Sequence, residues 1–163
     1  MNDKAQFERH ALNLGKLLGN LQSIEMGARI TIVKLDKKSA DQVQSQLQQL
    51  QVGDMVEFNT FTNDADLTQT LERYNKRAPH ACRIDIKPIV NLRDALAHGR
   101  TFGYGAKKQL RLLKFSRKAE GAKVLVELAV DMTDKWFYEN IKILEQALGR
   151  VRKALDYEVR EFS

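Results

Sequence analysis

The chain has 163 residues, of which 43% are apolar and 29% charged, and its formal net charge is +6. This length suits a single folded domain, which we expect to span residues 1–163. No apolar run reaches the roughly 18 residues that a membrane-spanning helix needs, and the polar start MNDKAQFERH is unlike a signal peptide. The only cysteine, Cys82, cannot form an internal disulfide, so these features together predict a cytoplasmic protein with no membrane partner.

The first half of the chain has the periodicity of helices. Apolar residues recur at intervals of three and four over residues 3–35, which indicates one long helix. A short polar helix is expected over 39–50 and another over 64–77, which Asn63 would cap with Asp66 three residues further on.

In the second half, a helix is expected to begin near Ile86, and Gly99 should end it as a left-handed cap. Strict alternation of apolar residues over 124–130 predicts a strand, with 110–115 as its partner. A last long helix is expected over 134–161, capped by Thr133 or Asp131. The sum is a mainly α fold, an antiparallel helical bundle with an inserted β-hairpin near 109–132.

One segment carries residues suited to chemistry. The stretch NLRDALAHGR, residues 91–100, places Arg93, Asp94 and His98 within six positions of an otherwise small, apolar helix. Asp94 lies four residues before His98, on the same face, and could orient its imidazole. Arg93 is five residues before His98, about 140° away around an ideal helix, so the two share a face only if the helix ends between them.

An arginine and a histidine suffice for one reaction class. RNA supplies its own nucleophile, the ribose 2′-hydroxyl, so a protein need only transfer protons and stabilise the charged phosphorane. No metal or cofactor is expected, because His10, His80 and His98 are scattered and the sequence has no Walker loop or dinucleotide fingerprint.

Positive charge is concentrated directly after this segment. Residues 99–123 contain eight basic side chains and a single acidic one, Glu120. Such a cluster attracts phosphate backbones, and we expect it to bind RNA through Arg100, Lys107, Lys108, Arg111 and Lys114. The alternative is a soluble hairpin whose lysines only protect its edge.

The segment NLRDALAHGR resembles the Arg-x4-His signature of the HEPN superfamily, small helical domains found in RNA-cutting toxins and phage-defence proteins. Arg93 matches the family arginine, Asp94 the polar residue after it and His98 the histidine, while Ala97 and Gly99 match the usual surroundings. The resemblance implies a HEPN-like fold and a homodimer in which two copies of the motif form one composite cleft. It also implies that Arg93 and His98 are catalytic and that Asp94 orients His98.

The activity implied is that of a metal-independent endoribonuclease with a toxin or defence role. RNA, a second copy of the chain and an antitoxin or defence-system protein are the expected partners. Two other hypotheses stay open, namely a non-catalytic dimeric module that binds RNA, a nucleotide or a protein, and a purely structural helical dimer. Many active members have asparagine or histidine where this chain has Asp94, whose charge would repel phosphate.

Overall fold

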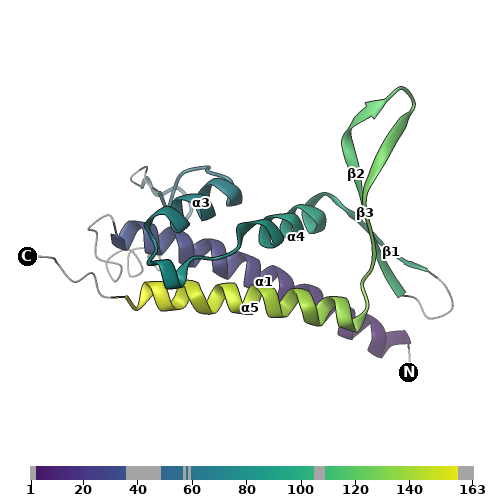
Figure 1. The fold of residues 1–163 in the computed structure, drawn as a ribbon, viewed down its shortest axis with the longest axis horizontal. Coiled ribbons are helices and arrows are strands. Elements are labelled where there is room, and N and C mark those ends of the chain that lie inside the picture. Colours follow the sequence, from purple (N-terminus) through teal and green to yellow (C-terminus); the bar gives the residue numbers. More distant parts are fainter. Residues whose placement is uncertain (1–2, 36–48, 57, 59, 105–108, 158–163) are drawn as a thin grey trace, which may run out of the picture. The chain divides into compact units, whose positions relative to one another are not determined.

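The computed structural model describes residues 3–35, 49–56, 58, 60–104 and 109–157, and it is mostly helical with a small antiparallel sheet (Figure 1). This confirms the mainly α prediction. Of the helix expected over 39–50, residues 39–48 lie outside the described residues, and the last two are not helical. The elements are, in order, α1 (Asp3–Leu35), α3 (Leu67–Arg77), a 3₁₀ turn (His80–Cys82), α4 (Ile86–His98), β1 (Arg100–Tyr104), β2 (Gln109–Glu120), β3 (Lys123–Asp131) and α5 (Asp134–Leu155).

The chain divides into two compact units, and each of the two longest helices contributes residues to both. The first, which we call the hairpin unit, combines Met1–Leu21 with Lys87–Leu144. The second, which we call the helical unit, combines Gln22–Ile86 with Glu145–Ser163.

The helices α1, α4 and α5 and the strand β2 supply apolar side chains to the core of the hairpin unit. Leu17 of α1, Ile89 of α4, Leu112 of β2 and Phe137 and Leu144 of α5 are almost completely buried. Fully burying a side chain of this size contributes about 1.5–3 kcal/mol. The amphipathic spacing of α1, α4 and α5 therefore accounts for how these helices and the sheet hold together.

The sheet has the strand order β1–β2–β3, and both strand pairs are antiparallel. The predicted hairpin is confirmed, and it is longer than expected because β2 continues to Glu120. Gly121 turns the chain with a φ of 62°, a conformation that favours glycine. The pairing of β1 with β2, in which Arg100 lies opposite Leu113, was not predicted from the sequence.

Gly99 ends α4 as predicted, but not for the predicted reason. The left-handed glycines among the described residues are Gly53 and Gly121, so Gly99 is not a left-handed cap. A Cβ at Gly99 would instead lie 2.3 Å from the Ala95 carbonyl oxygen and 2.6 Å from Leu112 Cδ1. Glycine is required here because the last turn of α4 and the adjacent strand β2 both leave no room for a Cβ.

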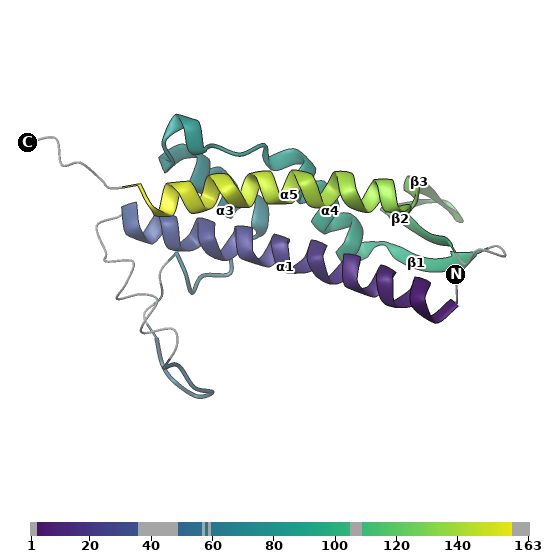
Figure 2. The same cartoon turned by 90° about the horizontal axis from the view of Figure 1, so that it is seen from below.

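In the helical unit, the second half of α1 lies beside the second half of α5 (Figure 2). Gly27 permits this approach, because a Cβ there would lie 2.6 Å from Val151 Cγ1. The buried Arg29 donates hydrogen bonds to the carbonyl oxygens of Thr60 and Ala65 at 2.9 and 2.6 Å. These bonds fasten the segment before α3 to α1.

Two helix ends differ from the prediction. Asp66, rather than Asn63, caps α3, and its carboxylate accepts a hydrogen bond from the Gln69 amide at 2.8 Å. Asn63 instead accepts from Arg29, at 3.0 Å, which places it outside the helix. Thr133 caps α5 as predicted, but the helix ends at Leu155 instead of near residue 161.

Candidate functional site

The motif lies on α4, within the hairpin unit. The helix does not end between Arg93 and His98, because it runs through His98 and the Gly99 amide still donates to the Ala95 carbonyl at 2.8 Å. The two side chains therefore leave α4 in directions about 140° apart. A single chain does not present Arg93 and His98 on one face.

Asp94 and His98 do share a face, as the sequence predicted. Asp94 Oδ1 lies 3.5 Å from His98 Nε2, and the side chains are 27% and 48% exposed, respectively. The imidazole is thus reachable from solvent at the end of the helix, while the carboxylate beside it is largely covered. This arrangement suits a carboxylate, Asp94, that orients a proton-transfer group, His98.

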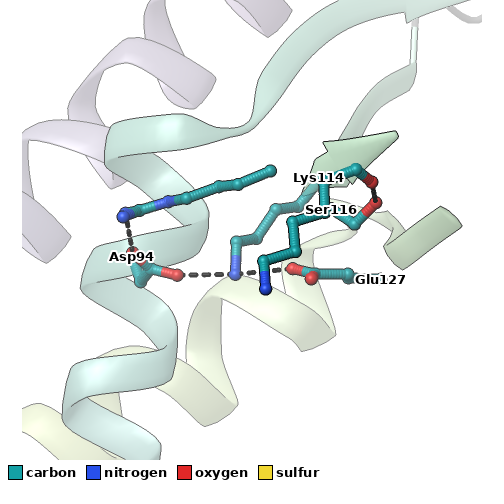
Figure 3. A pocket seen from close by; sticks show the side chains of 6 residues that line it. Asp94, Lys114, Ser116 and Glu127 are labelled. Atoms are coloured by element: carbon teal, nitrogen blue, oxygen red, sulfur yellow. Dashed lines mark hydrogen bonds and ion pairs between the residues drawn. The ribbon is translucent and has the colours of Figure 1, made fainter. Parts of the chain in front are cut away.

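The carboxylate of Asp94 is held by the hairpin, an interaction that the sequence did not predict. Lys114 Nζ of β2 lies 2.6 Å from Asp94 Oδ2 and 2.9 Å from Glu127 Oε2 of β3 (Figure 3). Arg117 adds a longer contact of 3.8 Å to Asp94. One lysine therefore ties α4 to both strands of the hairpin.

These contacts shift the pKa values of Asp94 and Lys114 in the directions that keep both side chains charged. The hydrogen bond from Lys114 holds the pKa of Asp94 below its ordinary value, and the bonds to Asp94 and Glu127 raise the pKa of Lys114. Because the Asp94 pKa is lowered on folding, the tie is fully present above about pH 4 and is lost as the pH falls through the lowered pKa. At neutral pH the charge of Asp94 is offset by its basic neighbours.

A pocket of about 320 Å³ opens beside this cluster. This volume is at the lower end of the range that small-molecule sites occupy, about 300–1,000 Å³. Acidic and basic groups both line the pocket, and its lining residues are Asp94, Lys114, Ser116, Arg117, Lys118 and Glu127. Three basic and two acidic side chains give the lining a net positive charge.

The residues predicted to bind RNA fall into three groups. Arg100 is exposed on β1, with its guanidinium 5.4 Å from the centre of the Phe115 ring. Arg111 pairs with Asp131 at 3.1 Å, and Lys114 is engaged by the two carboxylates described above. Lys107 and Lys108 lie outside the described residues.

Three basic residues outside the predicted set are more accessible. Arg117, Lys118 and Lys123 are exposed near the turn of the hairpin, and the Arg117 side chain is 80% exposed. They are among the eight basic side chains of residues 99–123. Only the fold shows that Arg111 and Lys114 have close acidic partners, whereas the side chains of Arg117, Lys118 and Lys123 are exposed.

In the part of the chain that the structure describes, no three His, Cys, Asp or Glu side chains are placed to hold a metal ion. Nor does any described helix have the length and apolar character needed to cross a membrane. The sequence matches no protein-family model, and neither a curated protein nor a solved structure shows significant similarity to the chain.

Proposed function

We propose that the protein is a metal-independent endoribonuclease of HEPN type, acting in the cytoplasm as a homodimer with a toxin or defence role. The observation that carries this proposal is the Asp94–His98 pair at the end of α4. Its acid is anchored by Lys114, and its imidazole is half exposed to a substrate. A structural core pair would leave neither group accessible.

The reaction needs only the substrate and these side chains. The 2′-oxygen of a ribose bonds to the adjacent phosphorus, and the bond from phosphorus to the 5′-oxygen breaks. His98 of each copy is suited to proton transfer, one accepting the 2′-hydroxyl proton and the other protonating the leaving oxygen. Arg93 stabilises the charge of the phosphorane, and the products carry 2′,3′-cyclic phosphate and 5′-hydroxyl ends.

A dimer completes this site. Since Arg93 and His98 leave α4 in different directions, one copy offers an oriented histidine without an arginine on the same face. Two α4 helices that face each other would bring the arginine of one copy to the histidine of the other. Exposed apolar side chains in the hairpin unit, among them Phe7, Leu12 and Leu18 of α1, favour self-association.

The ion pairs around Lys114 also favour a second function. A lysine that joins Asp94 to Glu127 fixes the hairpin on α4 and requires no chemistry at the motif. The adjacent pocket could then hold a phosphate-bearing ligand in a non-catalytic binding module. The two functions differ in whether purified protein cuts the RNA that it binds.

Replacing Arg93 separates the two functions. We expect wild-type protein to cleave RNA and Arg93→Ala to cleave it about 10²–10³-fold more slowly, because the phosphorane loses its charge stabilisation. Arg152→Ala, at an exposed position of α5, is the matched control and should retain activity. A wild-type protein that binds RNA without cutting it would favour the binding module.

The exposed basic residues of the hairpin should contribute to RNA affinity. Replacing Arg117 and Lys118 by glutamine removes two accessible charges, and each lost phosphate contact should reduce the salt slope of single-stranded RNA binding by about 0.7. The slope can be measured by fluorescence anisotropy in a His98→Ala background, which prevents cleavage. Arg111→Gln, whose arginine is paired with Asp131, should leave the slope nearly unchanged. Equal slopes in all variants would indicate that the basic residues of the hairpin do not contact RNA and only protect the edge of the sheet.

A further inference from the structure

We propose that the outer part of β3 pairs with β3 of a second copy, as an antiparallel strand pair centred on Leu125. The pairing joins two hairpins edge to edge. It goes beyond the proposed RNA cleavage and does not depend on it, because none of its residues belongs to the motif.

The outer half of the hairpin exposes an apolar strand at the edge of the sheet. In the described sheet β3 has β2 as its only neighbour, and its Val124, Leu125 and Val126 side chains are 49%, 69% and 50% exposed. The register with β1 reaches only to Leu113 of β2, so the hairpin continues as a two-stranded arm (Figure 1). Two-stranded hairpins are marginally stable in water, and an added strand would stabilise this one.

Backbone groups of β3 are directed toward the open edge. The Leu125 amide points to β2, where it donates to the Ser116 hydroxyl at 3.1 Å. Because backbone direction alternates along a strand, the N–H and C=O groups of Val124 and Val126 face away from β2. These groups can form a pair of hydrogen bonds with the same two residues of another copy.

The sequence of this edge is complementary to itself. In Lys123–Val124–Leu125–Val126–Glu127, antiparallel pairing about Leu125 places Val124 opposite Val126. It also brings Lys123 near Glu127, the residue at which the register of β3 with β2 shifts. A two-fold axis through Leu125 generates both charge pairs at once, and opposite charges across strands stabilise pairing. Charge complementarity therefore identifies a second copy as the partner of this edge.

The neighbouring register loses this complementarity. Centring the pair on Val124 would place Lys123 opposite Leu125 and Glu127 opposite Gly121, with no charge pair. A lysine on an edge strand ordinarily discourages edge-to-edge association. Here Glu127 of the second copy offsets the unfavourable effect of Lys123, because it carries the opposite charge. Glu127 also accepts from Lys114, but a carboxylate can accept from several donors.

A charge-swap series tests the pairing. Lys123→Glu places like charges opposite each other twice and should weaken self-association, measured by sedimentation equilibrium, by about tenfold (about 1.4 kcal/mol). The double variant Lys123→Glu/Glu127→Lys restores both pairs with reversed polarity and should regain most of the lost affinity. Lys153→Glu, an equal charge change at an exposed position of α5, should have no effect. A double variant that has the circular dichroism spectrum of wild type and associates no better than the single one would overturn the proposal.

A disulfide reports the register directly. In the proposed pair the two Leu125 Cα atoms would lie about 4.5 Å apart, within the range of about 4.4–6.8 Å that disulfides span. Leu125→Cys should therefore form a covalent dimer under mild oxidation. Val126→Cys should not, because its counterpart lies two residues further along the strand, roughly 7 Å in that direction alone. Wild type, whose Cys82 is buried, is the background control. A folded Leu125→Cys that gives no more covalent dimer than Val126→Cys would contradict the pairing.

Discussion

His98→Ala is expected to lower the rate of RNA cleavage by about 10²–10⁴-fold, because general acid–base help is typically worth that much. The fold should survive, since the imidazole is 48% exposed at the end of α4 and Asp94 keeps its contact with Lys114. RNA binding should also persist, because the accessible basic residues of the hairpin are unchanged. The measurement is single-turnover cleavage of a labelled RNA.

His80→Ala is the matched control for this experiment. His80 is exposed in the short 3₁₀ turn, in the helical unit, so its loss should leave the cleavage rate unaltered. Cleavage that persists in purified His98→Ala would reduce the histidine to a helix cap. Unfolding of His98→Ala would have the same consequence.

Gly99→Ala should lower the free energy of unfolding by about 3 kcal/mol, at the upper end of the cost of overpacking a core. The added Cβ would meet two backbone oxygens, those of Ala95 at 2.3 Å and Leu113 at 3.0 Å, which cannot rotate away as a side chain can. Relief of the Leu113 contact must move β2 away from α4, and relief of the Ala95 contact must distort the end of α4 itself. Urea unfolding monitored by circular dichroism measures the loss.

Gly15→Ala is the control for Gly99→Ala. A Cβ at Gly15 meets nothing within 4 Å, so alanine should raise stability there by up to about 1 kcal/mol through helix propensity. Gly99→Ala protein as stable as wild type would show that β2 does not approach α4 as closely as described. A movement of β2 should also separate Lys114 from Asp94.

The helices could be predicted from the sequence because their signals are local. Apolar spacing defines α1 over residues 3–35, and Pro88 in the first turn marks the start of α4 at Ile86. The end of α5 was placed too late because the apolar spacing continues past Leu155. The cap of α3 was misplaced because Asn63 and Asp66 are both good caps, and the buried Arg29 engages the first.

The site was less predictable because its contacts join distant parts of the chain. The pairing of Asp94 with His98 follows from helical spacing alone, so the sequence was sufficient. The pairing of Asp94 with Lys114 depends on where β2 packs, and no local pattern encodes that position. The same packing explains why Gly99 is a glycine, a reason that the sequence could not distinguish from a left-handed cap.

Cleavage of an oligonucleotide that has one ribose among deoxyribose residues, in the presence of a chelator, tests the proposed ribonuclease activity most directly. We expect a single cut after the ribose, giving a 2′,3′-cyclic phosphate and a 5′-hydroxyl end, because the neighbouring 2′-hydroxyl is the attacking group. An all-deoxy oligonucleotide should stay intact. Cutting of the all-deoxy strand, products with 5′-phosphate ends, or loss of activity with the chelator would contradict a metal-independent attack by the 2′-hydroxyl.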